Sequence, residues 1–241
     1  TVTKSELQAL GAFILFMQRE DGSFHSKYFE GAGYDPEFQS LYYPGEAMLA
    51  LTMLYEIDPD PRWLQAGLRS AAQLVRSREG QRKLPADHWM MLAGIPLLSL
   101  YPQVEDAPLS AAALRGHLAL LGQRIRRGQK RRSASAAPGE EGTFERKARS
   151  TPSATRLEGL HSLLKIQRSH GDVEEGLEES IRKGLGFLRR CQLKGEGPEH
   201  GGMPRSCATD PERRQRGREV RIDYVQHYLS AMLAATELGL Q

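Results

Sequence analysis

Residues 42–79, YYPGEAMLALTMLYEIDPDPRWLQAGLRSAAQLVRSRE, contain two consecutive helix patterns of different kinds. The first, at residues 44–56, is apolar nearly all round, as expected of a helix that is buried on most sides. The second, at residues 61–76, has one apolar stripe and one charged face, which is typical of a helix half exposed to water. Pro44 occupies a favourable position in the first turn. The stretch therefore predicts a helical hairpin with one inner and one outer helix.

The same alternation continues along the chain, and strand patterns are nearly absent. Period-3.6 patterns predict eight helices, at residues 4–17, 44–56, 61–76, 86–100, 109–127, 153–169, 174–191 and 220–239. Outer amphipathic helices alternate with inner apolar ones such as HWMMLAGIPLLSLY, in which Pro96 predicts a kink. We therefore predict an all-α fold of the α/α-toroid class, a ring of about four helical hairpins whose inner helices line a central cavity.

The domain organisation follows from length and composition. The 241 residues are enough to bury one good core, and we predict a single domain over residues 1–241. Residues 128–152 are rich in Ser, Ala, Gly, Pro and charge and are too long for a usual helix connection. We expect a flexible basic insertion there, with a lid that closes over an anionic ligand as the alternative.

Composition narrows the class of protein. A hydrophobic fraction of 39% and a charged fraction of 26% indicate a soluble globular protein. No apolar run reaches the length of about 18 residues that a membrane span needs. Cys191 and Cys207 are close enough to close a short loop as a disulfide, but a reduced pair is an equal alternative. The compartment, cytoplasmic or exported, stays open.

The positive charge is concentrated in one segment. RIRRGQKRR, residues 124–132, carries six cations, and without them the formal net charge of +3 becomes −3. A nucleic-acid-binding protein is expected to distribute basic residues over a folded face and to interleave them with aromatics. We therefore predict no nucleic-acid partner, and a small molecule or an oligosaccharide as the ligand.

Each inner helix begins in a short run of polar and aromatic residues. The four runs are YYPGE (42–46), PADHW (85–89), TRLEG (155–159) and RIDYVQH (221–227). We expect Asp87 to cap the second inner helix, and Ser153 or Thr155 to cap the third. In a toroid these four helix starts lie at one rim of the central cavity.

Carboxylates at this rim suggest acid–base chemistry. Two carboxylates that face each other across a cavity are the minimum for glycoside hydrolysis. We predict Asp87 and Asp223 as the catalytic pair, with Glu158 as a further catalytic candidate. A purely structural role as a helix cap is the alternative for Asp87.

The other rim residues are candidates for binding substrate. Aromatic side chains stack on sugar faces, and arginines suit an anionic sugar such as a uronate. The predicted substrate-binding residues are Tyr42, Tyr43, Glu46, His88, Trp89, Arg156, Arg221, Tyr224 and His227. For Glu46 the alternative is a favourable interaction with the helix N-terminus.

Asp223 and His227 are four residues apart, on one face of a helix. This spacing permits a hydrogen-bonded pair or two metal ligands, with Cys207 or His200 as a third ligand. No C-x-x-C or H-x-x-x-H pattern supports a metal site, and we predict neither a metal nor a cofactor. The remaining candidates, His25, His117, His161 and His170, are expected to be core or surface histidines without partners.

Two resemblances bear on architecture. Phe13, Ile14, Gln18, Gly22 and Phe24 in LGAFILFMQREDGSF match the spacing of the QW motif of squalene and terpenoid cyclases, and KGLGFLRRCQLKGEG (183–197) resembles its first half. In that motif the Gln caps a helix end and connects it to the next hairpin, so the resemblance implies a toroid. The D-x-D-D acid motif of squalene-type cyclases is absent.

The starts of the inner helices resemble those of the six-hairpin, α/α-toroid carbohydrate-active proteins, which include glycoside hydrolases, epimerases and lyase-like enzymes. This resemblance implies a carbohydrate-active enzyme or carbohydrate-binding protein that acts on an acidic or oligomeric saccharide. A terpenoid-cyclase-like or prenyl-handling protein, and a noncatalytic helical-repeat scaffold, are the alternatives.

Overall fold

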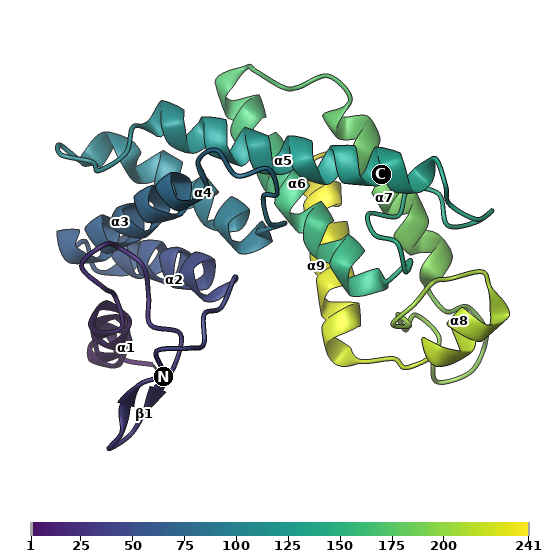
Figure 1. The fold of residues 1–241 in the computed structure, drawn as a ribbon, viewed down its shortest axis with the longest axis horizontal. Coiled ribbons are helices and arrows are strands. Elements are labelled where there is room, and N and C mark those ends of the chain that lie inside the picture. The colour runs from purple at the N-terminus through teal and green to yellow at the C-terminus, as the bar shows by residue number, and fades with distance from the viewer. Residues whose placement is uncertain (1, 241) are drawn as a thin grey trace. The chain divides into compact units, whose positions relative to one another are not determined.

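The computed structural model describes residues 2–240 and is mostly helical, with about 60% of the residues in helices (Figure 1). The described elements are α1 (Lys4–Phe16), β1 (Tyr28–Phe29), β2 (Gly33–Tyr34), α2 (Tyr43–Ile57), α3 (Pro61–Arg78), α4 (His88–Leu100), the 3-10 turn η1 (Tyr101–Gln103), α5 (Ala111–Ser133), α6 (Ser150–His170), α7 (Leu177–Cys191), α8 (Pro211–Arg216) and α9 (Ile222–Glu237). The strands form one small antiparallel hairpin. The helical class is confirmed, and the ring of hairpins stays a prediction.

The eight predicted helices are present, and three details differ. Helix α5 continues to Ser133 instead of ending near residue 127. Helix α6 begins at Ser150, so Ser153 lies inside it and donates to the Arg149 carbonyl rather than capping the helix. Thr155 is also inside α6, and the predicted cap is wrong. Helix α8, capped by Asp210, was not predicted because six residues are too short for a periodic pattern.

The chain divides into two compact units, Thr1–Leu121 and Gly122–Gln241. Each unit has buried apolar residues of its own and is described separately. The prediction of one domain over the whole chain stays a prediction.

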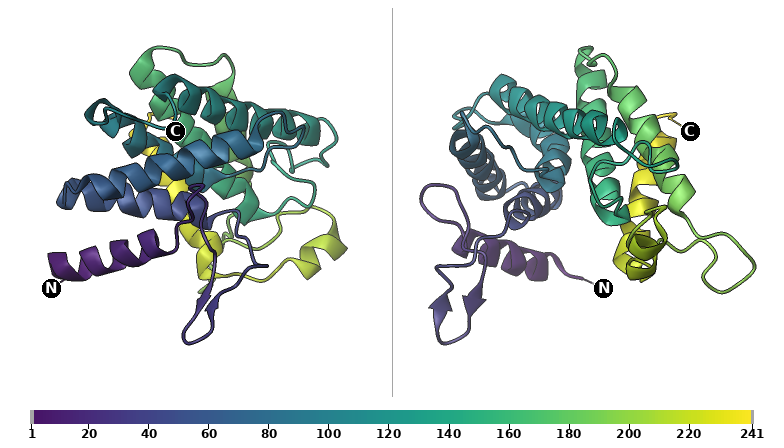
Figure 2. Two further views of the ribbon diagram at one scale, coloured as in Figure 1. Left: turned by 60° about the vertical axis from the view of Figure 1, so that its left-hand side comes forward. Right: turned by 45° about the vertical axis from the view of Figure 1, so that its right-hand side comes forward.

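In the first unit, α2 packs against both α3 and α4, and α1 packs beside α2. Helices α2 and α3 lie side by side (Figure 2). Leu51 and Leu54 of α2 meet the buried Trp63 of α3, and Ile14 of α1 packs on this cluster. Gly11 permits the close approach, because a Cβ there would lie 3.1 Å from the Trp63 ring. Helix α2 thus packs against α1 and α3, but Met53 and Ile57 are exposed, so the expectation that this helix is buried on most sides is wrong.

Gln18 connects the end of α1 to α3. Its Nε2 donates to the Ala66 carbonyl at 2.9 Å and to the Gly22 carbonyl at 3.3 Å, while Arg69 donates to its Oε1 at 2.7 Å. Gly22 has a φ of 90°, and a Cβ there would lie 2.5 Å from the Arg69 carbonyl oxygen. Phe24 is buried. The role expected for the QW-like Gln, a connection from one helix end to the next hairpin, is confirmed at this position.

In the second unit, α6 packs against α7 and α9. Thirteen of its residues are buried, which agrees with its prediction as an inner helix. Residues 134–149 are an irregular segment that contributes to the core, since Phe144 is 4% exposed and its ring lies against Gly184 of α7.

The second unit repeats the connection made by Gln18. Gln129 near the end of α5 donates at 3.0 Å to the Gly142 carbonyl and at 3.0 Å to the Ser180 carbonyl of α7. Gly142 has a φ of 86°, and a Cβ there would collide with the Lys183 carbonyl oxygen. EDGSF at residues 20–24 and EEGTF at residues 140–144 therefore perform the same task. The two units thus share one type of connection between helices. In the second unit, a longer insertion separates the Gln from the Gly.

The second QW-like segment behaves differently. Gln192 donates to the Gly201 carbonyl, in the loop that directly follows α7. It therefore closes a local loop instead of connecting two hairpins, and the repeat of the motif lies at Gln129, Gly142 and Phe144.

Cys191 at the end of α7 forms a disulfide with Cys207. The structure thus decides between the two alternatives that the sequence leaves open. The bond ties the loop before α8 to the end of α7.

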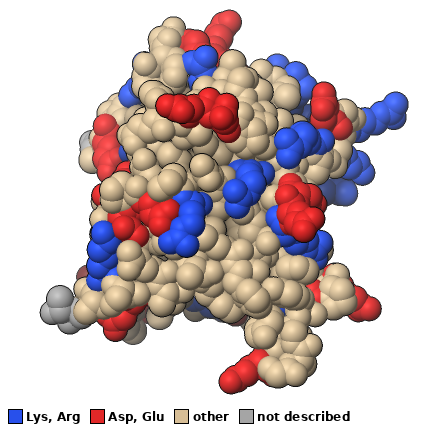
Figure 3. Space-filling view, turned by 90° about the vertical axis from the view of Figure 1, so that its left-hand side faces the viewer, with Lys and Arg blue, Asp and Glu red and all other residues tan. Residues whose placement is uncertain are grey.

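No helix within residues 2–240 is long and apolar enough to cross a membrane. On the face drawn in Figure 3, Lys and Arg side chains are interspersed with Asp and Glu side chains.

Candidate functional site

In the first unit the starts of α2 and α4 lie together. Gly45 permits this contact, because a Cβ there would lie 2.6 Å from both the Trp89 Cβ and the Met90 nitrogen. The Tyr42 ring meets the His88 ring edge-on with 5.2 Å between centroids, and His88 is equally close to Trp89. Two of the four predicted polar runs, YYPGE and PADHW, therefore converge.

Asp87 is fully buried and both of its carboxylate oxygens are engaged. Its Oδ1 accepts a hydrogen bond from the Met90 N–H at 3.0 Å, and its Oδ2 accepts one from Arg78 at 2.6 Å. Burial raises the pKa of Asp87, and the Arg78 guanidinium opposes that rise. The predicted cap is confirmed. These contacts favour a structural role for Asp87, and its catalytic role stays untested.

Glu46 stands in the first turn of α2, where a carboxylate interacts favourably with the helix N-terminus. Burial raises its pKa, and the negative charge of Asp87 raises it further. Tyr43 is well exposed, and its ring lies 6.2 Å from that of Phe38.

In the second unit α6 and α9 bring Glu158 and His227 together. The Nδ1 atom of His227 lies 3.2 Å from Oε1 and 3.1 Å from Oε2 of Glu158. The Glu158 side chain is 5% exposed and that of His227 is 18% exposed. The hydrogen bond to Glu158 raises the pKa of His227, and burial opposes this effect. The pair is thus a buried carboxylate that orients a partly accessible imidazole and raises its pKa.

This pairing corrects the predicted one. Asp223 does not form a hydrogen bond with His227; it accepts one from Arg221 Nε at 2.9 Å. Its charge still contributes to the raised pKa of His227. The carboxylate that contacts His227 is Glu158, which was predicted as the further catalytic candidate.

Tyr224 and Arg221 lie at the start of α9, and Arg156 lies near the start of α6. The Tyr224 ring is 6% exposed, its hydroxyl donates to Glu219 at 3.2 Å, and the Arg221 guanidinium lies over it at 5.1 Å. The ring therefore packs within the unit, while Arg221 is exposed. Arg156 donates to the Pro152 carbonyl at 3.0 Å, one turn earlier in α6.

Cys207 is bonded to Cys191, so it is not available as a metal ligand beside Asp223 and His227. The ligand set with Cys207, considered from the sequence, is therefore wrong. His200, the other candidate for a third ligand, lies exposed in the loop after α7.

The other histidines divide into two kinds. His161 is buried, and neither of its ring nitrogens has a hydrogen-bond partner among residues 2–240, as expected. Burial lowers the pKa of His161 to about 4, and that of His117 likewise. His25 stacks on Tyr34 with 3.9 Å between centroids, and His170 Nδ1 lies 2.8 Å from the Ile166 carbonyl. The expectation that His25 and His170 lack partners is wrong.

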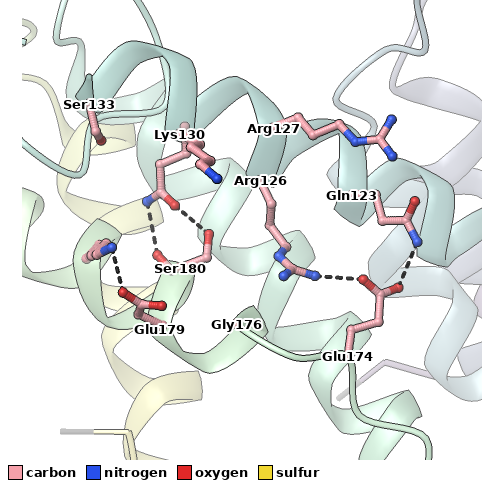
Figure 4. Close-up of a pocket in the computed structure, with 11 residues that line it drawn as sticks. Gln123, Arg126, Arg127, Lys130, Ser133, Glu174, Gly176, Glu179 and Ser180 are labelled. Atoms are coloured by element: carbon pink, nitrogen blue, oxygen red, sulfur yellow. Dashed lines mark hydrogen bonds and ion pairs between the residues drawn. The ribbon is translucent and has the colours of Figure 1, made fainter. Parts of the chain in front are cut away.

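A groove between α5 and α7 was missed by the sequence analysis (Figure 4). Its volume is about 690 Å³, and it lies on the side of α5 that carries the basic run 124–132. Arg126 and Gln123 both contact Glu174, as Figure 4 shows, and the Arg126–Glu174 ion pair measures 2.6 Å. Lys183 pairs with Glu179 at 2.6 Å. Since two of its four cations are neutralised by its own acids, the groove carries only a modest positive charge.

No protein-family model, curated protein or solved structure matches the chain. The site is therefore argued from the geometry of Glu158, His227 and their surroundings.

Proposed function

We propose that the protein is a carbohydrate-active enzyme that moves a proton on an acidic saccharide, with Glu158 and His227 as its acid–base pair. The observation that carries the proposal is the buried Glu158 carboxylate within 3.1 Å of the His227 imidazole. A carboxylate that holds one ring nitrogen fixes the tautomer and raises the basicity of a histidine. A general base of this kind works best with a pKa near the operating pH.

The proposed substrate class rests on a cation at the start of the helix that carries His227. Arg221 is an exposed cation at the start of α9, the helix that carries His227. An arginine of this kind suits the carboxylate of a uronate. His227 would accept the proton on the carbon next to that carboxylate, and the electron pair left behind would delocalise into the carboxylate. Return of a proton from water to the opposite face completes an epimerisation, and departure of the substituent on the adjacent carbon as an alcohol, which takes its proton from water, completes an elimination.

Two features of the architecture support the resemblance to α/α-toroid carbohydrate-active proteins. Helix α6 is largely buried and packs against the amphipathic α7, and Gln18 makes the connection expected of a QW-like motif.

A noncatalytic helical-repeat scaffold is the second candidate. The observation that favours it is the repeated connection made by Gln18 and Gln129, because repeat proteins reuse one packing unit. In that case the Glu158–His227 pair would only stabilise the packing of α6 on α9.

Exchange of solvent deuterium into saccharides separates the two candidates. The full chain is incubated in D2O with oligomers of glucuronate, galacturonate or mannuronate, and with a neutral oligosaccharide as the control. We expect deuterium in a uronate oligomer, read by NMR, or an unsaturated product, read by ultraviolet absorbance. His227→Gln should abolish either signal, and His200→Gln, which changes an exposed histidine in the same unit, should keep it. No signal with any uronate, or an undiminished signal in His227→Gln, would reject the enzyme proposal.

A further inference from the structure

A second, smaller pocket lies between residues 147–149 and residues 205–217 of the second unit. Its volume is about 340 Å³. Five cations and no acidic residue line it together with one serine and one glycine: Lys147, Arg149, Arg205, Ser206, Arg213, Arg216 and Gly217. The pocket is distinct from the pair formed by Glu158 and His227, neither of which lines it.

Backbone hydrogen bonds hold the two walls of the pocket together. The Ser150 N–H donates to the Arg205 carbonyl at 3.1 Å, and the Cys207 N–H donates to the Ala148 carbonyl at 2.8 Å. The disulfide from Cys207 to Cys191 anchors the same wall to the end of α7. The spacing between the two backbone walls that carry the cations is thus fixed by main-chain hydrogen bonds and a disulfide.

Ala148 occupies an unusual backbone conformation between two of the cations. Its φ is 49°, the one positive φ of a non-glycine residue within residues 2–240, and its side chain is fully buried. A left-handed conformation is unfavourable for alanine and persists only where the surroundings impose it, as they often do at binding sites. Here it sets the directions in which Lys147 and Arg149 leave the chain.

The nearby acids leave most of this positive charge available. Only Arg149 has an acid within hydrogen-bond distance, Glu145 at 3.1 Å. The three other arginines have an acid only at 3.8 to 4.0 Å: Arg205 with Glu219, Arg213 with Glu140 and Arg216 with Glu212. The pairs of Arg205 and Arg216 are exposed and contribute little, whereas Glu140 is buried and offsets part of the charge of Arg213. Lys147 makes no ion pair with any residue of the described range, 2–240.

We propose that this pocket binds a tetrahedral oxyanion group, a phosphate or a sulfate ester, carried by the ligand. A gathering of like charges is unfavourable on its own, and an anion with several oxygens relieves the repulsion among them. Guanidinium groups present parallel N–H donors that match such oxygens in pairs. Arg205 and Arg213 both line this one pocket, so both can contact one group.

The test is calorimetric titration of the full chain with inorganic phosphate, pyrophosphate and sulfate, and then with a sugar phosphate and a sugar sulfate. We expect saturable binding that weakens as the salt concentration rises. Lys147→Gln and Arg205→Gln should each raise Kd roughly tenfold, the effect of losing one charge-assisted hydrogen bond. Arg127→Gln removes the same charge from the other groove of this unit and should leave Kd unchanged.

The ester that binds more tightly identifies the source of the oxyanion, and either preference supports the proposal. Absence of binding, equal losses in Arg127→Gln and the two pocket variants, or binding of a nucleic-acid oligomer but of none of the small anions would overturn it. Unfolding curves of the variants should match that of the wild type, and a variant that fails this check is replaced by Arg216→Gln, whose side chain is the most exposed of those in ion pairs at the pocket.

Discussion

Asp87→Asn isolates the energetic role of the Arg78–Asp87 pair. The new side chain keeps the shape of Asp87 and, as a good N-cap residue, can still accept from the Met90 N–H. What disappears is the negative charge 2.6 Å from Arg78, whose side chain is only 7% exposed. Removing one partner of a buried ion pair leaves the other charge uncompensated and costs about 3–5 kcal/mol. We expect Asp87→Asn to lower the free energy of unfolding of the first unit by this amount.

The assay is hydrogen exchange of the α4 amides, with urea denaturation followed by circular dichroism. A double-mutant cycle with Arg78→Met gives the coupling energy, and the double variant should recover most of the loss because no buried charge remains. Asp60→Asn is the matched control, since Asp60 also caps a helix but pairs with an exposed arginine, and it should leave unfolding unchanged. A loss below about 1 kcal/mol in Asp87→Asn would refute the structural role and would favour Asp87 as a catalytic residue.

Three further predictions concern the second unit. Replacing Cys191 and Cys207 by Ser removes a loop constraint over a sequence separation of 16 residues, and should lower the free energy of unfolding by about 3 kcal/mol in denaturant titrations. Gly142→Ala should destabilise the unit by more than about 1 kcal/mol, because the φ of Gly142 is positive and the Lys183 carbonyl blocks a Cβ. The control Gly128→Ala, in open space on α5, should stabilise the unit by up to about 1 kcal/mol. Equal shifts of the melting temperature in the two variants would contradict this prediction. His161 has a folded-state pKa of about 4, against about 6.5 in the unfolded chain. The unfolded chain therefore binds more protons as the pH falls from 6.5 towards 4, and about 3 kcal/mol of stability is lost over that range. His161→Leu should remove this acid sensitivity, and an unchanged dependence of stability on pH would show that His161 does not cause it.

The alternation of apolar and amphipathic helices predicted most of the fold because each helix is long enough to show its period. The sequence predicts too early an end for helix α5 because its cations hide the apolar stripe. That stripe continues through Leu121, Ile125 and the buried Gln129. Ser153 was taken for a cap because a serine suits a helix start as well as an inward-facing turn. Local patterns thus determine which residues are helical more reliably than where a helix begins or ends.

The candidate site was predicted in part. The Asp223–His227 spacing along one helix suggested the pair, but the structure places Glu158 of α6 against His227. A contact between helices depends on how α6 and α9 pack. The spacing of residues within α9 carries no information about that packing. The basic pocket was missed for the same reason, since Lys147 and Arg205 are distant in sequence and come together through the backbone contacts around Ala148.

The central claim, that Glu158 orients His227 and raises its pKa, is tested most directly by an NMR titration of the His227 imidazole. In the wild type we expect a pKa above the usual value of about 6.5, because the hydrogen bond to Glu158 favours the protonated ring. The pair then stabilises the fold below pH 6.5, and this contribution is lost as the pH rises through the folded-state pKa. Glu158→Gln should lower the pKa of His227, whereas Glu219→Gln, which changes another acid of the unit, should shift it far less. A wild-type pKa at or below 6.5, or a value that Glu158→Gln leaves unchanged, would contradict the claim.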